Sequence, residues 1–125
     1  MAYPEDRNKE NARMKIADGV EVEKRDAVTI VGDSTIAPVE AGDDPVGVVA
    51  KRPAAAPGIP GEATTVALGG RRNAKVTDDA LPGDRLIGSG DGRLGPVPDT
   101  VDSSVPGVLC LRPAKDDGLG LILLR

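Results

Sequence analysis

The C-terminal stretch, residues 118–125, is the segment that most restricts how this chain can fold. It is aliphatic, it contains two glycines, and no residue in it would cap the start of a helix. An apolar segment of this kind promotes aggregation unless its backbone pairs with neighbouring strands. We therefore predict that it forms the closing strand of a β-sheet.

The rest of the chain consists of short extended segments separated by turns, and no window has a helical period. Valine and isoleucine alternate with polar residues through 20–30, which is typical of a half-buried strand. Further strands are predicted at residues 36–39, 46–50, 63–68, 71–76, 85–87, 93–97, 107–112 and 119–125. About nine short strands at this spacing predict an all-β fold, a small antiparallel β-barrel or sandwich.

Glycine and aspartate mark the expected turns. Gly69-Gly70 predicts a tight turn that makes 63–68 and 71–76 a hairpin, and residues 107–112 and 119–125 form a second predicted hairpin. Gly47 predicts a bulge or a close backbone approach within its strand. Four Gly-Asp pairs indicate a repeated turn geometry but no longer sequence repeat: 32–33, 42–43, 83–84 and 90–91.

Two segments are predicted to lie outside the strands. Residues 1–15 are charged and lack apolar periodicity, so we expect a flexible N-terminal arm that a neighbour orders, followed by a single β domain over 16–125. Residues 51–62 contain three prolines and form a long loop, either a projecting contact loop or a plain surface excursion.

The composition limits both stability and chemistry. The chain has one tyrosine, one cysteine, and no histidine, phenylalanine or tryptophan. Aromatic side chains usually dominate core energetics, so a core of valine, leucine, isoleucine and alanine predicts a marginal monomer that gains burial from other subunits or a larger scaffold.

Most function classes are disfavoured. Catalytic triads and acid–base pairs mostly use histidine, so we expect no enzyme, no catalytic residue and no cofactor. Cys110 is interpreted as a small buried hydrophobe. The net charge of −4 disfavours nucleic acid as a partner, and no apolar stretch or leader indicates a membrane or secretion. The excess of aspartate over lysine resembles proteins from high-salt cytoplasms.

Three kinds of local motif have an alternative reading. Adjacent carboxylates are interpreted as solvated turn residues rather than cation ligands, because none has calcium-loop spacing; they are Asp43-Asp44, Asp78-Asp79 and Asp116-Asp117. Residues 88–92 (GSGDG) predict a β turn rather than a phosphate loop, because no helix can follow them. Arg71-Arg72 is interpreted as a solvated strand edge. No metal site is expected.

Three passages together resemble a known family. They are Gly61-Glu62 through Gly69-Gly70 with Val66 between, then Pro82-Gly83-Asp84-Arg85-Leu86, and last Asp117-Gly118 through Leu124. In this order they are similar to the capsid cement, or head decoration, proteins of tailed viruses, over roughly residues 26–125. The N-terminal segment 1–15 is longer and more charged than that pattern requires.

The resemblance implies a compact β-barrel-like protein, usually trimeric, on the outer capsid surface at three-fold positions. Its partner would be the major capsid protein, and it would strengthen the shell; the aspartate excess suggests a virus of a salt-loving host. An alternative is a small intracellular β-barrel that binds a carbohydrate or a peptide, although such modules usually present aromatic platforms.

Overall fold

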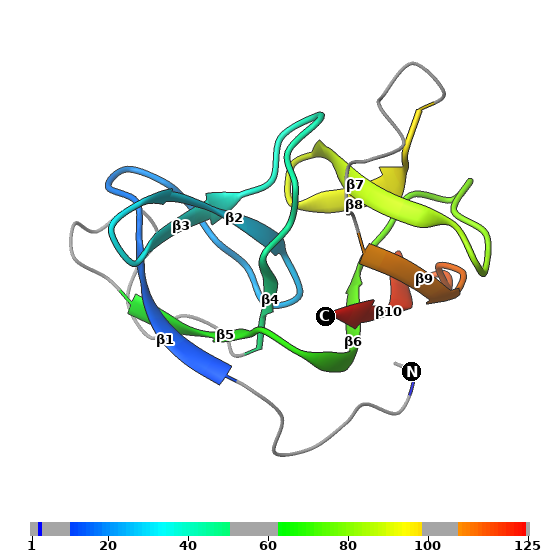
Figure 1. Cartoon of the computed structure of the whole chain (residues 1–125), viewed down its shortest axis with the longest axis horizontal. Coiled ribbons are helices and arrows are strands. Elements are labelled where there is room, and N and C mark those ends of the chain that lie inside the picture. Colours follow the sequence, from blue (N-terminus) through cyan, green and yellow to red (C-terminus); the bar gives the residue numbers. More distant parts are fainter. Residues whose placement is uncertain (1–2, 4–10, 51–62, 99–107, 125) are drawn as a thin grey trace.

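The fold is described from a computed structural model that covers residues 3, 11–50, 63–98 and 108–124 (Figure 1). These residues form ten β-strands and no helix. The predicted all-β class is therefore confirmed, with strands in two sheets, one of which is a small closed barrel.

The first sheet is the closed barrel, which we call the first unit. It contains β1 (Asn11–Ile16), β2 (Ala27–Gly32), β3 (Thr35–Pro38), β4 (Gly47–Val49) and β5 (Ala63–Ala67). Around the barrel the strands run β1-β3-β2-β4-β5, and β5 pairs with β1 to close it. All neighbours are antiparallel except β1 and β3, which are parallel.

The second sheet, the second unit, follows directly in the chain. It contains β6 (Gly70–Lys75), β7 (Arg85–Gly90), β8 (Arg93–Pro96), β9 (Val108–Arg112) and β10 (Leu119–Leu124). Its order is β6-β10-β9-β7-β8, and a single parallel bridge between Val76 and Leu94 joins its two ends. Because this bridge brings β6 next to β8, the sheet can also be read in the opposite direction as β6-β8-β7-β9-β10. This matches β1-β3-β2-β4-β5 in the first unit, with five added to each strand number.

Register and hydrogen bonding show that the two units are an internal structural repeat. The turn before β2 and the turn before β7 use the same pair of bonds: Asp26 N–H donates to Glu23 O and Glu23 N–H to the Asp26 carboxylate, as Asp84 N–H donates to Leu81 O and Leu81 N–H to the Asp84 carboxylate. Arg25 and Gly83, at matching positions, both have positive φ.

The repeat continues through the other strands. Ala17 N–H donates to Ile36 O and Thr77 N–H to Leu94 O, each at 2.9 Å, beside the two parallel pairings. Val49 N–H donates to Asp26 O and Val49 O accepts from Arg25 N–H. In the same way, Cys110 N–H donates to Asp84 O and Cys110 O accepts from Gly83 N–H. The hairpins β2–β3 and β7–β8 both carry a register shift near their tips.

The interiors of the two units correspond residue by residue. Seven buried residues fill the first barrel: Met14, Ile16, Val22, Val28, Ile36, Val49 and Val66. Their counterparts by register are also all buried: Ala74, Val76, Ala80, Leu86, Leu94, Cys110 and Ile122. This second cluster also includes four residues from the outer face of the first unit, so one apolar core continues between the units: Ala27, Val39, Val48 and Ala67.

The predicted hairpin of 63–68 with 71–76 is wrong. Strand β5 is occupied on both sides, by β4 and β1, and so offers no free edge to β6. Strand β6 pairs instead with β10, and Gly69-Gly70 links the two units. The predicted hairpin at the C-terminus is confirmed, because β9 and β10 are antiparallel partners.

The flexible-arm prediction is wrong for residues 11–15. They belong to β1, which lies between β3 and β5 and buries Met14 and Ile16 in the barrel. Tyr3, nearer the N-terminus of the expected arm, contacts its own chain. Its backbone N–H and C=O form two hydrogen bonds with the buried Asn73 side chain, and its hydroxyl donates to Pro113 O. A neighbour is therefore not needed to position Tyr3.

Other predictions have mixed outcomes. Gly47 does provide a close approach, because a Cβ there would lie 2.5 Å from Ala67 O. Residues 20–22 are not in a strand, although Val22 is buried. The loop at 51–62 and its contact role lie outside the described residues, and the single domain over 16–125 stays a prediction.

Candidate functional site

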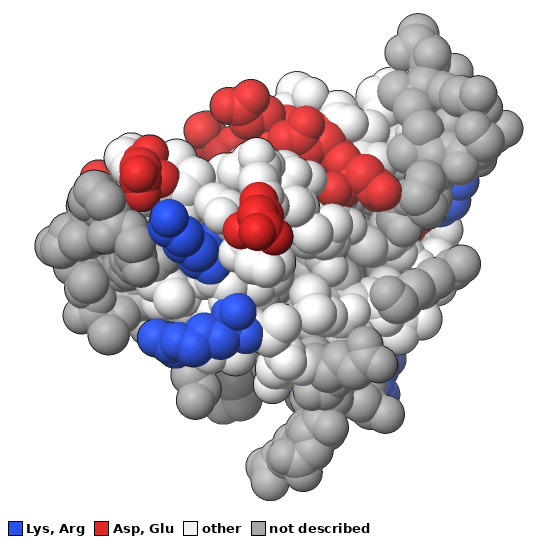
Figure 2. Space-filling view, turned by 60° about the vertical axis from the view of Figure 1, so that its left-hand side comes forward, with Lys and Arg blue, Asp and Glu red and all other residues white. Residues whose placement is uncertain are grey.

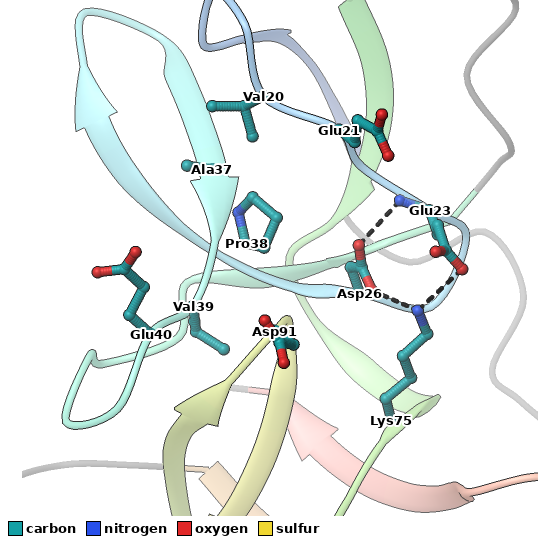
Figure 3. Close-up of a pocket in the computed structure, with 10 residues that line it drawn as sticks. All are labelled: Val20, Glu21, Glu23, Asp26, Ala37, Pro38, Val39, Glu40, Lys75 and Asp91. Atoms are coloured by element: carbon teal, nitrogen blue, oxygen red, sulfur yellow. Dashed lines mark hydrogen bonds and ion pairs between the residues drawn. The ribbon is translucent and has the colours of Figure 1, made fainter. Parts of the chain in front are cut away.

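A hollow among the described residues lies between the two units. It has a volume of about 470 Å³ and, as Figure 3 shows, the β2–β3 side of the first unit forms one wall while Lys75 and the β7–β8 hairpin close the other. Its lining residues are Val20, Glu21, Glu23, Asp26, Ala37, Pro38, Val39, Glu40, Lys75 and Asp91. A neighbouring hollow of about 630 Å³ shares Glu23, Lys75 and Asp91 with it.

A partly buried ion pair lies at the base of this hollow. The Lys75 ammonium donates to an Asp26 carboxylate oxygen at 2.6 Å and lies 3.2 Å from the Glu23 carboxylate. The Asp26 side chain is 5 % exposed, and its other oxygen accepts the Glu23 N–H at 2.8 Å. Asp26 therefore both caps the turn before β2 and binds the second unit.

The electrostatics of the pair keep the lysine charged. Burial acts to lower the pKa of Lys75, but hydrogen bonds and charge from Asp26, and then from Glu23, outweigh it and raise that pKa above 10.5. A lysine that serves as a nucleophile or base needs a lowered pKa, so this one acts as a structural cation.

The rim of the hollow is acidic. Glu21, Glu40 and Asp91 are exposed around it, and Figure 2 shows acidic side chains gathered in a band on one face of the molecule. No group of three metal-ligating side chains with suitable geometry occurs among the described residues. The arrangement thus favours cationic partners by charge, without forming a defined ion site.

The paired carboxylates singled out in the sequence are turn residues where the structure describes them. The Asp43 carboxylate accepts Glu40 N–H at 2.9 Å, and Asp117 accepts Leu119 N–H at 3.0 Å. Asp79 accepts a hydrogen bond from the Thr77 hydroxyl. The turn interpretation is confirmed for these three; their sequence partners Asp44, Asp78 and Asp116 are exposed.

The predicted turn at 88–92 is confirmed for residues 91–92, which join β7 to β8, whereas residues 88–90 are the end of β7. This hairpin tip has a further role. Gly88 N–H donates to Asp43 O at 2.7 Å, and Gly42 N–H donates to Gly88 O at 2.9 Å. A Cβ at Gly88 would lie 2.2 Å from Glu40 O. The glycines thus let the hairpin of the second unit approach the backbone of the first.

The two remaining motifs differ in outcome. Cys110 is fully buried, and burial together with the Asp84 charge raises the pKa of its thiol, which confirms the hydrophobe interpretation. The solvated-edge interpretation of Arg71-Arg72 is wrong for Arg72, which is 8 % exposed. Its guanidinium donates to Gly69 O and to the Asn11 side chain, so hydrogen bonds hold it against the chain although β6 is the end strand of its sheet.

The contact between Asp26 and Lys75 was missed from the sequence, although a signal for the repeat was available. Residues 84–97 align with 26–39 without a gap, with identity at five pairs: Asp26/Asp84, Gly32/Gly90, Asp33/Asp91, Pro38/Pro96 and Val39/Val97. Two of the Gly-Asp pairs that predict turns, 32–33 and 90–91, lie within this alignment, so the identities around them are the signal for the repeat.

Comparisons with known proteins add no relative: no protein-family model and no curated sequence matches this chain. Within the part of the chain that the structure describes, no helix has the length and apolar character required to cross a membrane.

Proposed function

We propose that this chain is a structural virion protein that decorates and stabilises the outer surface of an icosahedral capsid, as a trimer bound to the major capsid protein. The observation that carries the proposal is the order of the three passages that resemble capsid cement proteins. Each contains a residue that fixes the fold: Val66 is buried in the first barrel, Asp84 caps the turn before β7, and Ile122 is buried in the second unit.

The physical properties of the molecule are compatible with this role. A net charge of −4 and an acidic band on one face keep a crowded particle surface dispersed. The ion pairs of Lys75 with Asp26 and Glu23 beside the hollow stabilise the fold, and the lysine is held in the charged form. These features are compatible with a protein that binds a capsid and stabilises it.

Capsid binding is the direct test. Purified protein should be mixed with capsids assembled from the major capsid protein of the encoding virus and lacking the decoration protein. We expect co-sedimentation at a fixed stoichiometry and a capsid melting temperature several degrees higher, because a ligand that binds only the assembled shell stabilises it. Capsids of an unrelated virus serve as the control.

A protein that neither sediments with the capsids nor changes their melting temperature would overturn the proposal. A parallel screen on glycan and peptide arrays tests the alternative, a carbohydrate- or peptide-binding module. Saturable binding there, without capsid binding, would favour that alternative.

A further inference from the structure

We propose that copies of this chain associate head to tail, with the β2–β3 hairpin tip of one copy docking on the outer face of the second unit of the next. The inference rests on the internal repeat and does not depend on the capsid role. It extends to a neighbouring copy the contact that already joins the two units.

The contact within the chain is one-directional. The β7–β8 tip of the second unit docks on the first unit through Gly88 and Gly92: Ala27 N–H donates to Gly92 O, and Gly92 N–H donates to Val39 O. The matching β2–β3 tip of the first unit does not make the reciprocal contact, because Ile30, at the position of Gly88, and Ser34, at that of Gly92, are exposed. The units are therefore related by a heterologous contact rather than by a closed two-fold.

A heterologous contact leaves one unused surface at each end of the pair. The first unused surface is the β2–β3 tip, where Ile30 is 54 % exposed and Val31 is 55 % exposed. Within the described residues, only one other large hydrophobic side chain is this exposed, namely Leu81 at 62 %. Leu81 occupies in the second unit the position that Glu23 occupies beside the interface in the first.

The second unused surface is the outer face around Leu81. In the first unit the residues buried against the second unit are Ala27, Val39, Val48 and Ala67. Their counterparts by register in the second unit are all only partly buried: Arg85, Val97, Leu109 and Leu123. Three of these four are aliphatic, so the face that receives a hairpin tip in the first unit is repeated in the second as a partly exposed apolar face.

The new contact is related to the internal one without copying it. In the first unit β1 pairs with β3 up to Lys15 and Thr35, near the β2–β3 tip. The backbone beside that tip is therefore already paired, and the tip presents the side chains of Ile30 and Val31 to a partner. These side chains are complementary to an aliphatic face, whereas Gly88 suits close backbone approach. Repetition of a heterologous contact produces a closed ring or a filament.

The test is the oligomeric state of the full chain without capsids, measured by sedimentation velocity over a micromolar concentration series. We expect the wild type to form a species larger than the 12.8 kDa chain. The tip variant I30D/V31D and the face variant L81D should each weaken association by about 100-fold, as for central apolar contacts. Arg13→Asp, an exposed site on β1 with the same charge change as the tip variant, should behave as the wild type.

Mixing the two variants separates head-to-tail from tip-to-tip association. The L81D chain keeps an intact tip and the I30D/V31D chain keeps an intact face, so an equimolar mixture should form a 1:1 dimer and nothing larger. Thermal melts of each variant verify that it is folded. A monomeric wild type, association unaffected by either variant, or a mixture that stays monomeric would overturn the proposal.

Discussion

The two units have the same strand order but close their sheets differently. In the first, β1 and β3 pair at Lys15–Thr35 and Ile16–Ile36 and complete the barrel. In the second, only the Val76–Leu94 bridge spans the corresponding gap. The first unit fills that gap: Lys75 N–H donates to Arg25 O at 3.2 Å, beside the bond from Ala27 to Gly92.

This difference shows how one repeated architecture can serve two purposes. The first unit is complete in its backbone pairing and presents side chains at its hairpin tip. The second unit uses backbone groups and glycines to hold the first, and its sheet is incomplete without that partner. Substitutions at matching positions should therefore have unequal effects, and three pairs of variants test this, from the largest expected effect to the smallest.

The largest difference is expected between Gly88 and Ile30, which occupy the same place in the two hairpins. Gly88→Ala places a Cβ 2.2 Å from Glu40 O and 3.0 Å from the Val39 Cβ, so the units must separate locally. We expect a loss of about 3 kcal/mol in unfolding free energy, at the upper end of overpacking effects. Ile30→Ala, at an exposed site, should change it by less than ~0.5 kcal/mol.

Urea unfolding of dilute protein, where self-association is absent, measures both values. Equal, small effects of the two substitutions would contradict the asymmetry of the hairpins.

The second comparison is between Lys75 and Lys15, which match in β6 and β1. Lys75→Met leaves the buried Asp26 carboxylate without its cation and should cost about 2 kcal/mol, less than a fully buried pair because the Lys75 side chain is 25 % exposed. Lys15→Met changes an exposed residue and should cost less than ~0.5 kcal/mol. Chemical denaturation at pH 8 measures both.

The pH dependence of the same variants sharpens the test. Because folding raises the pKa of Lys75 above its ordinary value of 10.5, the contribution of its charge is complete below pH 10.5 and is lost as the pH rises through the folded-state pKa. The stability gap between wild type and Lys75→Met should therefore narrow in strongly alkaline solution. A gap that stays constant to high pH would show that the ammonium charge is unimportant.

The smallest effects are expected at Val49 and Cys110, which occupy equivalent interior positions and are both fully buried. Cys110→Val and Val49→Cys are nearly volume-conserving and should each change stability by about 1 kcal/mol or less. In the folded protein both thiols should be inert to a thiol reagent, because burial opposes formation of the thiolate. Rapid labelling of either native thiol would argue against equivalent interiors.

Much of the fold could be predicted from local patterns. The alternation of apolar and polar residues located most strands, and the turn residues 88–92 identified the β7–β8 hairpin. Strand β1 was missed because Asn11, Arg13 and Lys15 leave only Met14 and Ile16 buried, too short a pattern to distinguish from a charged arm. The hollow between the units was not predicted, because Asp26 and Lys75 are separated by most of the first unit.

The sequence by itself determined that this chain is a β protein with an aliphatic interior, because strand alternation and turn chemistry act between near neighbours. Only the tertiary structure decided that β6 pairs with β10 rather than β5, and that the units pair Lys75 with Asp26. Those choices depend on which strand edges are already occupied and on where a glycine allows two backbones to meet. Both are properties of the assembled sheets, and local sequence does not contain them.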